Sequence, residues 1–281
     1  MNVHSVLPDS LTAAVDEVLR EAAVEHVAHD GPPLRGAEVA AADPDAAALI
    51  GPFRSADVAE ALETTAPAGL PLLAPVATWA GITRDDEPGC DDAARPLGTV
   101  LRMVARDTEV AARIAADLRA AGRRALVLAG GHDYGVQLDG QLRLASLPRV
   151  ADPAEADVLV LCGLARAPEI ERARALAPLP VIAFDGVQGS ALGAGRDVRL
   201  ALPVAPDDDV VAGDELFFVE PTRRAARLVA ASLAEGLRER ATLLAAMRRA
   251  GPYDEHGDPV DAPVWLWRAG DDWSLSPDRP L

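Results

Sequence analysis

The sequence predicts an α/β protein built on parallel sheets with helices on both faces. Short apolar runs alternate with amphipathic helical patterns over most of the 281 residues. The apolar runs are continuous in Val, Leu and Ile, which is typical of strands that are covered on both faces. Strands that alternate with helices form βαβ units, and these units build doubly wound parallel sheets. Ligands of such sheets bind beyond the carboxyl ends of the strands.

The elements follow one another in a regular order. Apolar runs predict strands at residues 3–7, 24–28, 47–50, 70–74, 100–104, 125–129, 158–162, 181–184 and 198–202. Amphipathic patterns between most of them predict helices at residues 11–23, 33–42, 56–65, 107–121, 134–144 and 168–177. Segments 74–98 and 205–215 have no core periodicity and interrupt the alternation. Residues 222–250 then predict a helix pair, and residues 265–273 predict a terminal β-hairpin. We therefore expect two lobes with several crossings between them.

Charge and hydropathy limit the partners. The formal net charge is −17, so nucleic acid and anionic membranes would be repelled, and neither is expected as a partner. No stretch approaches the roughly 20 apolar residues of a membrane span, so no direct membrane insertion is expected. The N-terminal sequence MNVHSVLPDS has no signal-peptide features, which predicts a cytoplasmic protein. A periplasmic or other extracytoplasmic location is the alternative if a leader was removed.

Neither a metal nor a cofactor is expected. Cys90 and Cys162 lie far apart without zinc-like spacing and are interpreted as free thiols. His132 with Cys162 would be a candidate Cys-His pair, but no third orienting residue or nucleophile motif accompanies them. The segment LAGGHDYG lacks the spacing of a dinucleotide-binding loop. The protein is therefore not predicted to be an enzyme, and a small α/β enzyme is kept only as an alternative.

One strand end has the features of an anion site. Residues 45–63, DAAALIGPFRSADVAEALE, predict a buried strand, a Gly-Pro turn and a helix just after Ser55. The free N–H groups of a helix N-terminus favour an anion over the end of the strand. Ser55 either adds its hydroxyl to this site or merely caps its own helix.

Further segments match a known family in their order. They are IGPFRS, PLLAPVATWAGIT, VLRMVARDTEVAARIAADL, HDYGVQLDG, VIAFDGVQGSAL and GPYDEHGDP. From about residue 45 onward, the chain resembles the type 1 periplasmic solute-binding fold, specifically the leucine/isoleucine/valine-binding family of ABC transporter substrate-binding proteins. The resemblance implies two lobes, joined by three crossovers, that close on a small ligand. It places lobe one at residues 1–103 plus 207–250 and lobe two at residues 104–206 plus 251–281.

The resemblance also implies ligand-binding residues in lobe one. In the family, Ser and Thr hydroxyls and backbone N–H groups hold the carboxylate of an amino acid. Ser55 and Thr78 match the hydroxyl positions, and Val76 and Ala77 match the backbone positions. The alternative for Thr78 is that it only turns a loop.

In lobe two, the resemblance assigns an acidic and an aromatic residue. Asp185 matches the residue that takes the ligand's ammonium group, although Arg166 or a helix N-terminus would also satisfy its charge. Tyr134 matches an aromatic residue that closes over the ligand, with a core or hinge role as the alternative. Arg54 would favour an additional acidic group on the ligand, or would pair with Asp57.

The chain is somewhat truncated relative to the family. Residues 3–7 run almost directly into a helix, without a long first loop, and Leu164 and Ala165 stand where aromatic residues are expected. Residues 145–157 are too short for a full helix. The predicted function is binding of a small amino-acid-like or amide-like solute, for an ABC permease or as a sensor for a regulatory protein. The alternative is a degenerate binding fold that acts as an interaction module.

Overall fold

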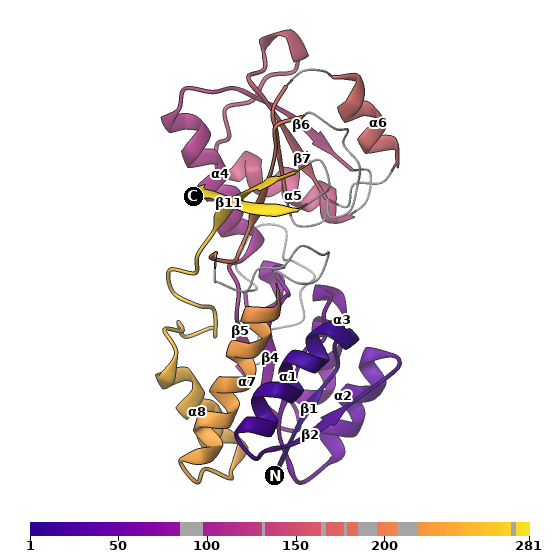
Figure 1. Ribbon diagram of the computed structural model, residues 1–281, viewed down its shortest axis with the longest axis vertical. Coiled ribbons are helices and arrows are strands. Elements are labelled where there is room, and N and C mark those ends of the chain that lie inside the picture. The colour runs from indigo at the N-terminus through magenta and orange to yellow at the C-terminus, as the bar shows by residue number, and fades with distance from the viewer. Residues whose placement is uncertain are drawn as a thin grey trace. The chain divides into compact units, whose positions relative to one another are not determined.

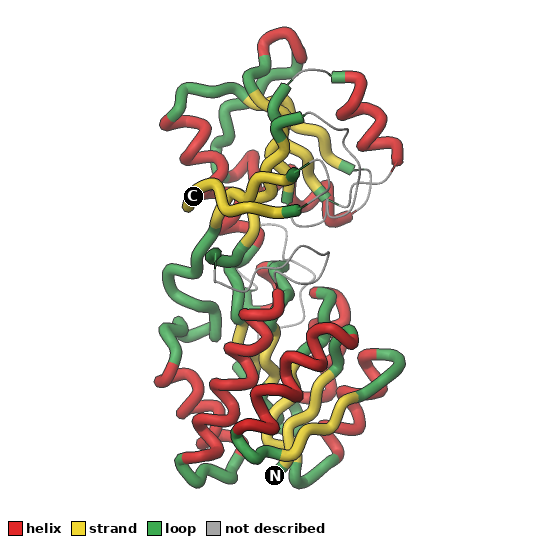
Figure 2. The backbone as a smooth tube through the Cα atoms, in the orientation of Figure 1, coloured by secondary structure: helices red, strands yellow, loops and turns green. Residues whose placement is uncertain are grey.

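The chain divides into two compact α/β units. The structure, a computed structural model, describes residues 1–84, 98–130, 133–163, 167–176, 179–184, 196–206, 218–270 and 274–281. Figures 1 and 2 show its helices and strands. Unit 1 consists of Met1–Arg106 and Phe218–Ala262, and unit 2 consists of Asp107–Phe217 and Pro263–Leu281. The chain therefore passes between the units three times. Residues 104–106 and 251–262, which the family resemblance places in lobe two, group with unit 1.

Unit 1 contains a five-stranded sheet in the order β2-β1-β3-β4-β5, with all strands parallel. Its strands are β1 (Asn2–Ser5), β2 (Glu25–Ala28), β3 (Ala46–Ile50), β4 (Leu72–Ala74) and β5 (Val100–Arg102). Its helices are α1 (Asp9–Glu21), α2 (Pro33–Ala42), α3 (Ser55–Thr65), the short 3-10 helix η1 (Ala80–Ile82), α7 (Val219–Ala234) and α8 (Arg240–Ala250). Every residue of the central strand β3 is buried, as expected of a strand that is covered on both faces.

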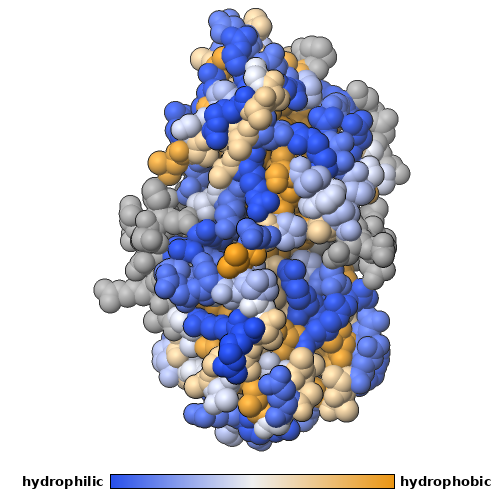
Figure 3. All heavy atoms as spheres, turned by 90° about the vertical axis from the view of Figure 1, so that its left-hand side faces the viewer, coloured by the Kyte–Doolittle hydropathy of each residue, from blue (hydrophilic) through white to orange (hydrophobic). Residues whose placement is uncertain are grey.

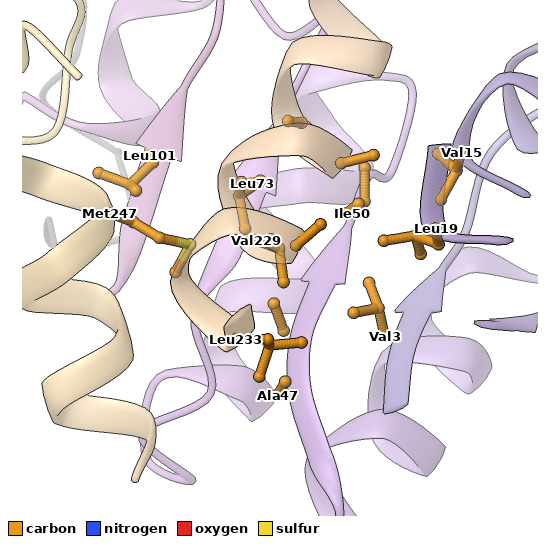
Figure 4. Close-up of a cluster of buried hydrophobic side chains, with 14 of the residues drawn as sticks. Val3, Val15, Leu19, Ala47, Ile50, Leu73, Leu101, Val229, Leu233 and Met247 are labelled. Atoms are coloured by element: carbon orange, nitrogen blue, oxygen red, sulfur yellow. The ribbon is translucent and has the colours of Figure 1, made fainter. Parts of the chain in front are cut away.

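Each face of this sheet packs against its own helices. On one face, Ile50 and Leu73 share a buried cluster with residues of α1, α7 and α8, including Val229 (Figure 4). On the other face, Leu49 and Leu72 share a second cluster with residues of α2 and α3. Neighbouring residues of one strand thus pack into clusters on opposite faces of the sheet, because side chains alternate along a strand. The side of the molecule in Figure 3 is mainly hydrophilic, with hydrophobic residues in small groups.

Unit 2 contains a six-stranded sheet in the order β11-β10-β9-β8-β7-β6. Its parallel strands are β6 (Ala125–Ala129), β7 (Val158–Cys162), β8 (Val181–Ala183) and β9 (Val198–Leu202). The C-terminal strands β10 (Trp265–Ala269) and β11 (Leu275–Pro280) add to it in antiparallel orientation. Its helices are α4 (Asp107–Ala120), α5 (Asp133–Leu144), the short 3-10 helix η2 (Pro153–Glu155) and α6 (Ala167–Ala175). A βαβ array is therefore completed by a hairpin.

The predicted elements are confirmed, with differences at their ends. The strands at 125–129, 158–162 and 198–202 have the predicted bounds. Strand β4 begins two residues later than predicted, because Pro71 has no N–H for the ladder. The predicted helix pair and terminal hairpin are both present.

Two stacked histidines lie on β1 and just after β2 in unit 1. His4 of β1 is 2% exposed, and its ring stacks on that of His29 with the centroids 5.0 Å apart. Nδ1 of His4 lies 2.7 Å from Nε2 of His29, while Nε2 of His4 lies 3.0 Å from the Asp43 carboxylate. Desolvation lowers the pKa of His29, and the charges of His4 and His26 lower it further.

This pair predicts that unit 1 loses stability in mild acid. Because the folded state lowers the pKa of His29 from 6.5, the unfolded chain binds the proton more readily. We expect the free energy of unfolding to decrease as the pH falls below about 6.5 toward the folded pKa. Urea unfolding at about pH 7.5 and about pH 5.5 measures this decrease. His29→Gln removes the titrating imidazole and should make this decrease smaller. An equal decrease in wild type and His29→Gln would contradict the prediction.

Candidate functional site

Two segments leave the same edge of the unit 1 sheet. Strands β3 and β4 are adjacent and parallel, with Ile50 opposite Leu73. After β3, a turn at Gly51 and Pro52 leads into α3, and after β4, residues 75–79 lead into η1. We call residues 75–79 the β4 loop. Because the carboxyl ends of parallel strands meet at one edge, the N-terminus of α3 and the β4 loop are neighbours.

Ser55 connects these two segments. It is the first residue of α3, and the backbone N–H of Trp79 donates a hydrogen bond to its hydroxyl oxygen at 3.3 Å. Arg54 is the N-cap residue, and its side chain makes no capping hydrogen bond in the described structure. The contact that the described structure gives the Ser55 hydroxyl is thus with the β4 loop. Ser55 holds the β4 loop beside the first turn of α3.

The β4 loop presents backbone donors. Val76, Ala77 and Thr78 are all buried. Within the part of the chain that the structure describes, their N–H groups make no hydrogen bond to another backbone carbonyl. The first N–H groups of α3 likewise have no partner inside the helix. Backbone N–H groups at a helix N-terminus and in the loop beside it favour an anionic acceptor, so this edge of the sheet has the chemistry of a site for a carboxylate.

Arg102 lies behind the β4 loop. It is the last residue of β5, is 0% exposed, and its guanidinium donates to the carbonyl oxygens of Ala77 and Trp79, the latter at 2.9 Å. The same group donates to the hydroxyl oxygen of Thr83 at 2.9 Å and, through Nε, to the Asp258 carboxylate at 2.9 Å. A single buried side chain thus joins β5, the β4 loop and the 251–262 segment.

Asp258 carries the opposite charge at this junction. Its carboxylate is 2% exposed and lies 3.2 Å from Nε of Arg84 and 3.5 Å from Nε of Arg106. Arg84 also pairs with Asp254. Burial opposes ionisation of Asp258, but the charge of Arg102, the hydrogen bonds from Thr83 and Arg102, and the charge of Arg106 together hold its pKa below the usual range. The carboxylate is therefore ionised at neutral pH.

The predicted site residues fall into separate groups. The structure brings Ser55 together with the β4 loop of Val76, Ala77 and Thr78 in unit 1. Tyr134 lies in unit 2 at the start of α5, and its hydroxyl donates to the Asp107 carboxylate at 3.4 Å. Asp185 and Arg166 lie outside the described residues. Arg54 pairs with Asp57 at 3.0 Å on the surface, which agrees with the second of its two interpretations.

Three residues that hold this region together, Arg102, Thr83 and Asp258, are not among the predicted site residues. The signal for Arg102 was present, because an arginine stands inside the apolar run 100–104, where burial requires a partner. Asp258 had no such signal, since it lies in an irregular segment without periodicity.

Of the groups considered for other chemistry, Cys162 is the one that the structure describes. Cys162 is a free, buried cysteine, and burial raises the pKa of its thiol, which disfavours the nucleophilic thiolate. His132 and Cys90 lie outside the described residues. Among the residues that are described, no group of His, Cys, Asp and Glu side chains could hold a metal ion. No helix found in that same portion is long and apolar enough to span a bilayer.

Comparison with known proteins identifies the fold. The sequence matches no protein-family profile and no curated protein. Solved structures do match over nearly the whole chain, and they show that it has the type 1 periplasmic solute-binding fold. An ABC transporter substrate-binding protein from Desulfitobacterium hafniense is 19% identical, with a TM-score of 0.79 and 99% of each chain covered.

Two further structures carry names that include a ligand. A leucine-binding protein from Thermotoga maritima is 17% identical, with a TM-score of 0.74, covering 100% of this chain and 98% of that one. A solute-binding protein from R. palustris in complex with benzoate is 15% identical, with a TM-score of 0.71, covering 99% of this chain and 95% of that one. The predicted fold class of two α/β lobes with three crossovers is thus confirmed.

Proposed function

We propose that the chain is a solute-binding protein whose unit 1 holds the carboxylate of a small ligand. The observation that carries this proposal is the pair of donor segments joined by Ser55, the first turn of α3 and the β4 loop. Neutral N–H and hydroxyl donors at a helix N-terminus suit a carboxylate. Leucine and benzoate, which appear in the names of structurally similar proteins, have a carboxylate as their common group.

Two further residues complete the ligand contacts that we propose. In this proposal Asp185 accepts hydrogen bonds from the ligand's ammonium group, and Tyr134 adds an aromatic contact. A ligand with both charges is amino-acid-like, and an amide replaces one charged group by a neutral one. The two units then correspond to the two lobes of a binding protein, and the ligand shifts the population toward the form that it binds better.

The partner depends on where the protein acts. An exported chain would deliver its solute to an ABC permease, and a cytosolic chain would signal to a regulatory protein. Fractionation of source cells with an antibody against the chain separates these roles. The solved structures that the fold resembles are of solute-binding proteins.

A calorimetric screen tests the proposal. The panel contains L-leucine, L-isoleucine, benzoate and small aliphatic amides, and we expect at least one of them to bind. Ser55→Ala removes a hydroxyl donor to the carboxylate and should weaken a carboxylate ligand by about tenfold or more. Thr64→Ala is the matched control, because it removes a hydroxyl from the same helix at its far end. It should leave the affinity unchanged.

A second variant separates the two halves of the proposed site. Asp185→Asn should weaken an amino acid, which carries an ammonium group, but not benzoate, which has none. Absence of binding by the whole panel would sink the proposal and favour the interaction module instead. Unchanged affinity of a bound ligand in Ser55→Ala would show that the carboxylate lies elsewhere.

A further inference from the structure

We infer that Arg102 is a positioning residue of the carboxylate site: its guanidinium fixes the β4 loop so that loop N–H groups are presented to the ligand. This inference rests on the proposed function. Arg102 itself does not touch the ligand in this scheme, because it is 0% exposed and each of its three nitrogen atoms already donates to Ala77, Trp79, Thr83 or Asp258.

The geometry of the peptide group gives the mechanism. In a trans peptide, the C=O of one residue and the N–H of the next point in opposite directions. Arg102 holds the carbonyl of Ala77, so the N–H of Thr78 points away from the guanidinium. It also holds the carbonyl of Trp79, whose own N–H bonds to Ser55. The loop is thus held through two of its carbonyls, while the N–H of Thr78 points to the opposite side and the N–H of Trp79 is held by Ser55.

Only arginine can make this set of contacts. Its planar guanidinium presents several donors in a rigid fork, whereas lysine has one compact ammonium group on a flexible stem. Arg102 uses the fork on two carbonyls while Nε stays on the Asp258 carboxylate. The negative charge of Asp258 compensates the buried guanidinium. Arg102 therefore donates to the loop carbonyls without leaving an unpaired positive charge beside the loop.

The test compares Arg102→Lys with Arg84→Lys. The side chain of Arg84 contacts Asp254 and Asp258 but, in the described part of the chain, no carbonyl of the β4 loop. Both variants keep the positive charge next to Asp258. Hydrogen exchange of the amides of residues 76–79 is measured in the protein without added ligand, and affinities for L-leucine and benzoate are measured by calorimetry. We expect Arg102→Lys to speed loop exchange and weaken binding by about tenfold each, with Arg84→Lys near wild type.

The outcomes separate this inference from the proposed function. Equal loop exchange in the two variants overturns the positioning role. Faster exchange in Arg102→Lys, with no binding of either probe by the wild type, overturns the proposed function and leaves the role of Arg102 in loop geometry standing. If Arg102→Lys fails to fold, Thr83→Val repeats the comparison, since it removes one guanidinium contact without removing a charge. Wild-type loop exchange in a folded Thr83→Val protein would then count against the inference.

Discussion

Asp258→Asn is expected to lower the free energy of unfolding of unit 1 by about 3–5 kcal/mol. Asp258 and Arg102 are 2% and 0% exposed, and their charges lie 2.9 Å apart. Removing the carboxylate charge leaves a buried guanidinium without compensation, which costs much more than loss of a surface ion pair. Chemical denaturation measures the loss, and hydrogen exchange assigns it to unit 1.

Asp254→Asn is the matched control for this substitution. Asp254 also pairs with Arg84, but its side chain is 27% exposed, so the same change should cost about 1 kcal/mol or less. Its Oδ1 accepts backbone N–H groups of His256 and Asp258, and asparagine preserves that acceptor. Equal losses in the two variants would contradict the assigned importance of the Arg102–Asp258 pair.

Gly51→Ala is expected to destabilise unit 1 by about 3 kcal/mol. Gly51 has a φ of +100°, a conformation that a residue with a Cβ rarely adopts. A Cβ at this position would lie 2.4 Å from the carbonyl oxygen of Val6, so the backbone would have to shift. Because this turn leads from β3 into α3, the shift should also weaken any ligand held by the first turn of α3. Urea unfolding and calorimetry measure the two effects.

Gly69→Ala separates the cost of the positive φ from the cost of the close Cβ contact in Gly51→Ala. Gly69 has a φ of +63°, but a Cβ there would meet nothing within 4 Å. The strained conformation alone should cost about 1–2 kcal/mol, with no effect on ligand affinity. A loss in Gly51→Ala no larger than that in Gly69→Ala would show that the contact with Val6 is easily relieved.

The sequence by itself determined the sheets, the helices and the first part of the candidate site. Hydrophobic periodicity is a local property, and strands such as 158–162 are read directly from a short continuous apolar run. The start of α3 at Ser55 follows from the Gly-Pro turn and the amphipathic pattern after it. Parallel pairing of successive βα units then brings residues 75–79 next to Ser55, because both segments follow strands of one sheet.

Only the tertiary structure decided how that site is held. The hydrogen bond from Trp79 to Ser55 spans 24 positions, and the pair of Arg102 with Asp258 spans 156. The chain has 27 basic and 44 acidic residues, so charge alone does not select the partner of Arg102. Tertiary packing selects the carboxylate that pairs with Arg102, because a fold that buried the guanidinium without a partner for its charge would be strongly destabilised. The 251–262 segment, which has no periodicity, lies beside β5 and supplies that carboxylate.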